Sequence, residues 1–207
     1  MSRAELARLY LRERYPARRF VPLALLLGGM GILASPELAR VTLEDAARAW
    51  ARGTSLAYLL VLSFRVWDDL EDREVDAVLH PERITVRADR VSPLRWLSWI
   101  FIDIAGLLVL LGPQRMERLL VLVALGVALL LWYLVRAAAG RTPIADAVVV
   151  LTKYPVIAYL AAPAVLWEDG GLLRAAPFLL ALYLFLCVHE VLDDPVLRRS
   201  FGKGALS

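Results

Sequence analysis

Long apolar stretches alternate with short charged segments along this chain. Four stretches contain no charged residue: 20–36, 53–64, 119–135 and 175–188. Two longer stretches, 96–114 and 142–167, are interrupted only by Asp103, Asp146 and Lys153. A helix needs ~20 mostly apolar residues to cross a bilayer, and fewer where long polar side chains reach the interface. The pattern therefore predicts an all-α polytopic membrane bundle of about six transmembrane helices.

Residues 1–19 precede the first apolar stretch and carry six arginines between helically spaced apolar positions. No small-residue cleavage site follows in a suitable setting, so we interpret this segment as a cytosolic amphipathic lead-in rather than a signal peptide. We expect a single membrane domain over residues 1–207, with the helical bundle in 20–194 and a cytosolic tail in 195–207.

The placement of lysine and arginine predicts the orientation. With the N-terminus in the cytosol, the cytosolic segments carry 17 basic residues and the outer segments carry six. This positive-inside bias places both termini in the cytosol, as expected for an integral protein of the inner or plasma membrane. It also places two acidic clusters on the cytosolic face.

Composition narrows the class of protein. Hydrophobic residues make up 59% of the chain, above the roughly 45–50% of soluble domains, which argues against disorder and against a soluble globule. A single cysteine excludes an internal disulfide framework and a cysteine-rich zinc site within this chain. The formal net charge of +3 gives no reason to expect nucleic acid as a partner, whereas membrane lipid is the expected surrounding.

The first acidic cluster directly follows the 53–64 stretch and comprises Asp68, Asp69, Glu71, Asp72, Glu74 and Asp76. On a continuous helix of about 100° per residue, Asp69, Asp72 and Asp76 would lie within an arc of about 60°. Such carboxylates repel one another unless a cation neutralises them, and hard oxygen ligands suit Mg²⁺. The cluster therefore predicts a magnesium site, with Asp68 beside it. The alternative is a solvated acidic loop in which Arg73 forms local ion pairs.

The second acidic cluster lies near the end of the chain. Glu190, Asp193 and Asp194 would share one side of a helix end, and His189 is their neighbour in sequence. On its own, such a cluster is typical of a polar helix end at the membrane boundary. Together with the first cluster, it predicts Mg²⁺ ions held between two acidic patches and bridged by a diphosphate, because a diphosphate cannot approach so many carboxylates without cations.

Isolated charges within the apolar stretches are costly unless they are paired or face a cavity. Lys153 is expected either to form a structural ion pair with Asp103 or Asp146 or to belong to a functional site. Arg136 and Arg141 follow the 119–135 stretch at its cytosolic end. They would contact a phosphate or would only mark the topology.

The string from Asp69 to Pro81 resembles the first aspartate-rich motif of the UbiA prenyltransferase superfamily, Asn-Asp-x-x-Asp-x-x-x-Asp followed by Arg-Pro. The matching residues are Asp69, Asp72, Asp76 and Pro81, while Asp68 replaces the asparagine and His80 replaces the arginine. Arg83 resembles a second arginine often found just beyond.

Two further regions are similar to this family. Its fourth span ends in a tyrosine and basic residues followed by Arg-Thr-Pro, as do Tyr133, Arg136 and Arg141 with the Thr-Pro that follows. In its second motif, Asp-x-x-Asp-x-x-x-Asp, Glu190 and Asp193 fit the first two positions and Leu197 occupies the third.

The resemblance implies a helical bundle around a cavity in which Mg²⁺ helps to bind and ionise an isoprenyl diphosphate, whose prenyl group then passes to an acceptor. The implied catalytic residues are Asp69, Asp72, Asp76, Glu190 and Asp193, and the implied metal ligands are these five with Asp68 and Asp194. The implied substrate-binding residues are Arg65, His80, Arg83, Tyr133, Arg136, Arg141, Lys153 and His189.

Two other functions stay open. A membrane terpene cyclase of the same fold would ionise the same substrate and close the carbocation on itself. A non-catalytic family member would act as a lipid-binding or partner subunit, which Asp68, His80 and Leu197 favour. A CDP-alcohol phosphotransferase is disfavoured, because its Asp-Gly start and downstream Gly-x-x-x-Asp-x-x-x-Asp are absent.

Family members usually have nine spans, so a bundle of six is expected to have a lateral opening. We expect a second copy, or another membrane protein, to cover it, and closed self-association is the commoner solution. Gly28, Gly29 and Gly31 would allow the close approach of a helix from a second copy. Alternatively, they pack against a neighbouring span of the same chain.

Overall fold

The computed structural model describes residues 2–33, 42–140, 142–162 and 171–193, and each regular element in these ranges is a helix. In chain order the helices are α1 (Arg3–Arg14), α2 (Ala17–Leu33), α3 (Leu43–Glu71), α4 (Arg73–Leu79), α5 (Ile84–Arg87), α6 (Ser92–Leu110), α7 (Arg115–Ala139), α8 (Pro143–Leu151), α9 (Lys153–Ala161) and α10 (Gly171–Asp193).

Four helical segments within the described residues are long and apolar enough to cross a membrane: Ser92–Leu110 (α6), Arg115–Ala139 (α7), Ile144–Ala161 (α8 with α9) and Leu173–Leu192 (in α10). The predicted all-helical membrane protein is confirmed at this level. α2 has 17 residues, and α3 carries charges towards both ends. Membrane crossing by these two helices, and hence a total of six spans, stays a prediction.

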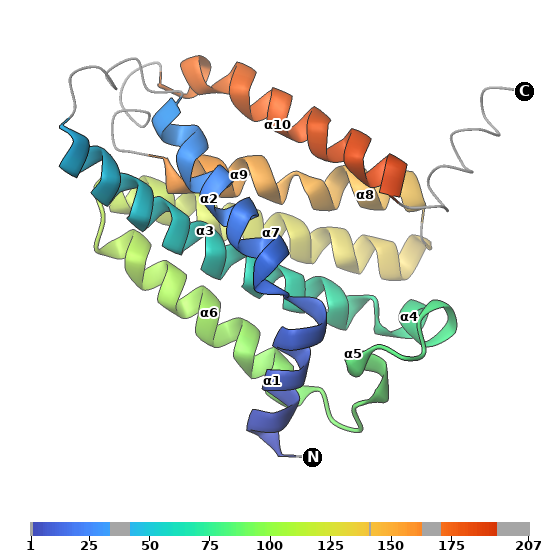
Figure 1. The fold of residues 1–207 in the computed structure, drawn as a ribbon. Coiled ribbons are helices and arrows are strands. Elements are labelled where there is room, and N and C mark those ends of the chain that lie inside the picture. The colour runs from blue at the N-terminus through green and yellow to red at the C-terminus, as the bar shows by residue number, and fades with distance from the viewer. Residues whose placement is uncertain (1, 34–41, 141, 163–170, 194–207) are drawn as a thin grey trace, which may run out of the picture.

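Helix α3 lies at the centre of the bundle (Figure 1), packed against α2, α6 and α9. Its middle is buried on several sides, with Leu56, Leu60, Phe64 and Val66 all in the core. A helix that is apolar all round is expected at such a central position. Helix α10 lies on α8 and α9, along the outside of the bundle.

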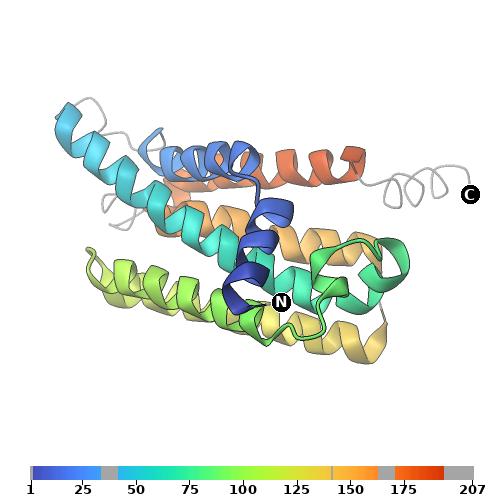
Figure 2. The ribbon, with the colours of Figure 1, turned by 60° about the horizontal axis from the view of Figure 1, so that its bottom comes forward.

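Helix α1 runs across the bundle rather than along it (Figure 2), and contacts α5 and α6. Ser2 begins the helix with a capping box, in which its hydroxyl accepts the Glu5 N–H while the Glu5 carboxylate accepts the Ser2 N–H. Leu6 and Tyr10 are buried, and the opposite face exposes Arg8 and Arg12. The lead-in segment is therefore an amphipathic helix docked on one end of the bundle.

Glycines allow the backbones of α2, α3 and α9 to approach closely. A Cβ at Gly28 would lie 2.5 Å from the backbone nitrogen of Thr54, and one at Gly53 would lie 2.5 Å from the carbonyl oxygen of Ala161. Gly29 faces the Trp50 ring. Gly28 and Gly29 therefore pack within the chain, which was the alternative to packing between copies. What surrounds Gly31 lies outside the described side chains.

We expect Gly28→Ala to lower the free energy of unfolding by about 1–3 kcal/mol, because the added methyl group meets the Thr54 backbone and the helices must move apart. Unfolding of the purified protein in mixed micelles with increasing denaturing detergent measures this. Gly126→Ala in α7 is the matched control, since no atom lies within 4 Å of its added Cβ. The control is expected to be neutral or stabilising, and equal losses in both variants would contradict the close contact.

Candidate functional site

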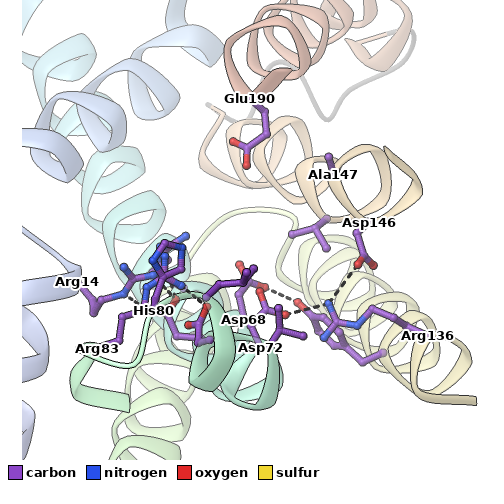
Figure 3. Close-up of a pocket in the computed structure, with 16 residues that line it drawn as sticks. Arg14, Asp68, Asp72, His80, Arg83, Arg136, Asp146, Ala147 and Glu190 are labelled. Atoms are coloured by element: carbon purple, nitrogen blue, oxygen red, sulfur yellow. Dashed lines mark hydrogen bonds and ion pairs between the residues drawn. The ribbon is translucent and has the colours of Figure 1, made fainter. Parts of the chain in front are cut away.

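A pocket of about 390 Å³ opens at the end of the bundle where α3 meets α4, α7, α8 and α10 (Figure 3). Among the described residues, six carboxylates line it: Asp68, Asp69, Asp72, Asp76, Asp146 and Glu190. Four guanidinium groups alternate with them: Arg14, Arg65, Arg83 and Arg136. Because charges of both signs converge here from distant parts of the sequence, this pocket is the candidate functional site.

Asp68 is buried near the end of α3 and joins three helices. Its carboxylate accepts hydrogen bonds from the Tyr133 hydroxyl of α7 and from the Lys153 ammonium of α9. The side chains of Lys153 and Asp68 are only 3% and 12% exposed, so the pair is largely removed from water. Removal of either partner would leave a buried charge uncompensated, which is strongly destabilising.

A break between α8 and α9 positions Lys153. Pro155 has no N–H to donate to the carbonyl of Leu151, so the helical hydrogen-bond ladder cannot continue here. Thr152 lies between the two helices, and its hydroxyl donates to the Val149 carbonyl at 2.6 Å. The first residue of the new helix is then Lys153, whose side chain reaches Asp68.

The predicted ion pair of Lys153 with Asp103 or Asp146 is wrong. Lys153 pairs with Asp68, which the end of α3 brings to the break between α8 and α9. Asp146 lies 3.7 Å from Arg136 and accepts a hydrogen bond from the Trp132 ring N–H at 3.1 Å. Asp103 is exposed on α6, away from the pocket.

Asp69 connects α3 with the docked helix α1. Its carboxylate accepts the Tyr10 hydroxyl at 2.8 Å and two N–H groups of Arg14, at 2.8 and 3.1 Å. Arg65, one turn earlier on α3, lies 3.5 Å away. Burial, with the Asp69 carboxylate adding to it, raises the pKa of Tyr10 well above its ordinary value. The phenol therefore keeps its proton and acts as a donor.

The helix is interrupted at Asp72, which ends α3 and precedes α4 with backbone angles of −89° and 0°. The single stripe expected for Asp69, Asp72 and Asp76 on a continuous helix is thus broken, and the three carboxylates face different cations. Asp72 lies 3.0 Å from Arg136, a residue of α7. Arg136 also donates to the carbonyl of Glu71 at 3.4 Å.

Asp76, on α4, pairs with Arg83 through one carboxylate oxygen. Its other oxygen, Oδ2, is buried and accepts no hydrogen bond from the described residues. Arg73 does not form the ion pairs of the solvated-loop alternative; it donates to the carbonyls of Thr85 and Ala88, at 3.0 and 2.9 Å. Arg73 thereby holds α4 against α5 and shapes the wall on which Asp76 lies.

The second acidic cluster is described in part. Glu190 points from α10 towards the acidic residues of α3 (Figure 3), and it lines the same pocket. His80 lies at the pocket rim with its ring 3.6 Å from Glu82, whereas His189 is exposed and does not line the pocket. Arg141, Asp194 and the side chain of Asp193 lie outside the described part of the structure.

The carboxylates of the pocket are neutralised mainly by arginine and lysine. No three His, Cys, Asp or Glu side chains among the described residues are grouped closely enough to hold a metal ion. Interleaved cations relieve the repulsion that adjacent carboxylates would otherwise exert on one another. The buried Oδ2 of Asp76 is the acceptor in this wall that fits an added cation.

No family model, curated protein or solved structure matches this chain. The resemblance to the UbiA superfamily therefore rests on the residues of the motifs quoted above.

Sequence reasoning missed the part played by α1. The interpretation of residues 1–19 as an amphipathic segment gives Tyr10 and Arg14 no part in the site, yet both bind Asp69. Leu6, Tyr10 and Arg14 recur every four residues and so share one face of the helix. Two residues with polar groups, Tyr10 and Arg14, thus continue the buried face that begins at Leu6. This pattern indicates that the face packs against a charged group.

We expect Asp68→Asn and Lys153→Met each to lower the free energy of unfolding by about 3 kcal/mol, because each leaves a buried charge without its partner. The double variant should lose clearly less than the sum, since it removes both charges. Detergent-induced unfolding of the four proteins gives this double-mutant cycle. Additive losses would show that the two residues do not interact.

Arg14→Met should loosen α1, because Asp69 then loses two hydrogen bonds from a charged donor, each worth about 1.5–3 kcal/mol. The expected result is faster proteolysis within residues 1–19 of the reconstituted protein. Arg12→Met, on the exposed face of the same helix, is the control and should be cut at the wild-type rate. Unchanged proteolysis in both variants would show that Asp69 does not hold α1.

Proposed function

We propose that this protein is a Mg²⁺-dependent membrane prenyltransferase of the UbiA type, which ionises an isoprenyl diphosphate in the cytosol-facing pocket and transfers the prenyl group to an acceptor. One observation carries the proposal. Residues of three separate regions that resemble the family, Asp68–Asp76, Tyr133–Arg136 and Glu190, line one pocket although more than a hundred positions of sequence separate the first from the last.

The charge balance of the pocket suits a metal-bound diphosphate. Its six carboxylates face four arginines and the buried Lys153, so the described wall is close to neutral. A free diphosphate carries about three negative charges and would meet carboxylates on every side. Mg²⁺ would neutralise the diphosphate as it leaves. The residues proposed to hold the metal are the aspartates and glutamate of the two acidic clusters: Asp68, Asp69, Asp72, Asp76, Glu190, Asp193 and Asp194.

The cations of the wall have a proposed role in binding the diphosphate. Arg83 and Arg136 are paired with Asp76 and Asp72, the residues proposed as metal ligands. A carboxylate that turns towards a metal frees its arginine for a phosphate oxygen, for which the guanidinium fork is well matched. Binding would therefore exchange one set of ion pairs for another rather than leave charges unpaired.

Aromatic and apolar groups adjoin the charged wall. The rings of Tyr133 and Trp67 are tilted against each other with their centroids 5.5 Å apart, and Arg136 lies over the Tyr133 ring. Val75, Leu79 and Val150 supply apolar lining. Such surfaces suit an isoprenyl chain, and aromatic faces stabilise an allylic carbocation while water is kept away.

A specific observation favours the non-catalytic alternative. Asp68, Asp69, Asp72 and Asp76 all have a basic partner in the structure, so the wall is neutralised without a metal. A lipid-binding subunit would need no more than this arrangement, with the arginines holding an anionic headgroup. Such a protein would bind an isoprenyl diphosphate without cleaving it.

The test is release of pyrophosphate from isoprenyl diphosphates of different lengths by the protein in nanodiscs, with and without an aromatic acceptor. We expect release that requires Mg²⁺ and that falls by about a hundredfold in Asp76→Asn, because the buried carboxylate is a proposed metal ligand. Asp89→Asn is the matched control, since Asp89 is an exposed acid that does not line the pocket, and it should keep wild-type activity.

Other outcomes separate the alternatives. Complete release without an acceptor, giving a cyclic hydrocarbon, would identify a terpene cyclase. Binding of the diphosphate with no release, unaffected by chelation of Mg²⁺, would identify a non-catalytic subunit. Wild-type release by Asp76→Asn would show that this carboxylate is not a ligand.

A further inference from the structure

Asp103 is a carboxylate on the outer face of a membrane-spanning helix. It is exposed on α6, and its neighbours along the same face, Trp99, Ile100 and Leu107, are exposed apolar side chains. No hydrogen bond or ion pair joins Asp103 to any residue that the structure describes. The outer face of α6 thus combines a lipid-compatible surface with one unpartnered charge.

The position of Asp103 along α6 places it far from the aqueous phases on either side of a bilayer that this helix spans. It lies eleven residues after Ser92, the start of the 19-residue helix α6, which corresponds to about 16 Å along the axis. This is near the middle of a hydrocarbon core of ~30 Å. Ionisable residues at such a depth are rare and, in known membrane proteins, pair with another polar group or face a cavity.

The buried basic residues of the spanning helices have partners, while Arg95, Arg115 and Arg174 lie near the ends of their helices and away from the depth of Asp103. Lys153, the lysine at a comparable depth, binds Asp68 inside the bundle. Arg118, on α7, donates to the carbonyls of Leu160 and Ala162. The cation for Asp103 must therefore come from outside the described part of the chain.

A second copy of this chain does not supply that cation at this face. A two-fold axis along the membrane normal keeps equal residues at equal depth, so Asp103 would meet residues of its own depth in the copy. Among the described residues, the lysine at that depth is Lys153, which is buried and already paired with Asp68. Gly106, one turn further along α6, leaves room for a close approach, because an added Cβ there has no atom within 4 Å. The charge of Asp103 and the room beside Gly106 together fit a helix from a protein other than a second copy of this chain.

We propose that the face of α6 around Asp103 docks a membrane-spanning helix of a partner protein, and that this helix carries a lysine or arginine near mid-membrane. The charged pair would form within the bilayer, where its polar groups have no competing water. Gly106 would let the two backbones come close, while Trp99 and Leu107 pack on either side of the pair.

The test uses the full chain in nanodiscs and two synthetic leucine/alanine helices of about 22 residues, one with a central lysine and one with a central leucine. Energy transfer between labelled protein and labelled helix measures binding. We expect the lysine helix to bind roughly tenfold more tightly than the leucine helix, and Asp103→Asn to abolish this preference. Glu117→Gln, which removes an exposed carboxylate at the end of α7, should leave the preference intact.

Three results would overturn the proposal. The two helices could bind wild-type protein equally, or the preference could persist in Asp103→Asn. The protein could also dimerise on its own in an Asp103-dependent way, which would assign the face to a second copy. Circular dichroism and detergent unfolding of Asp103→Asn confirm that a lost preference does not reflect a lost fold.

Discussion

The rest of the structure depends on the buried ion pair of Asp68 and Lys153. The Tyr133 hydroxyl also donates a hydrogen bond to Asp68. Together these contacts join the central helix α3 to α9 and α7 at one end of the bundle. At the other end of the same contact, Gly53 of α3 lies against the Ala161 carbonyl of α9. These two contacts set the register of α3 against α9. Helix α10 packs on α8 and α9.

The same pair explains why the pocket has its present form. With Asp68 held from inside the bundle, the residues that follow along α3 and α4 face outward to the remaining cations. Asp69 meets Arg14 of α1, Asp72 meets Arg136 of α7, and Asp76 meets Arg83. Each of these three carboxylates forms an ion pair with an arginine from a different part of the fold. The same ion pairs therefore form the pocket and hold the surrounding helices in place.

The sequence predicted the features that depend on apolar runs and local spacing. The helices α6, α7 and α10 overlap the stretches 96–114, 119–135 and 175–188, with ends that differ by a few residues, because a run of apolar residues of that length has few other stable states near a bilayer. Asp68, Asp69, Asp72, Asp76 and Glu190, which the spacing assigns to one site, all line the pocket, together with Asp146, which the spacing does not assign to it. Their role as metal ligands is a separate matter and stays a prediction.

Other features depended on partners that sequence spacing does not specify. The break at Thr152 follows from Pro155, but the acid that Lys153 then meets is determined by where α3 ends. The interruption at Asp72 has no proline or glycine to mark it, and it replaced the expected stripe of carboxylates with separate ion pairs. Arg14 reaches Asp69 across 55 positions of sequence, a contact that only the tertiary fold defines.

Lys153 and Asp103, the two charged residues near the middle of their spanning segments, differ in where their charge is balanced. Lys153 faces inward, where α3 supplies a carboxylate and α7 a hydroxyl, so its charge is balanced by the chain. Asp103 faces outward from α6 among tryptophan, isoleucine and leucine, where nothing described in the chain balances it. Since a charge at this depth is costly in lipid, the proposed partner helix would supply the polar group that completes Asp103. The inner charge thus stabilises the fold, while the outer one specifies a neighbour.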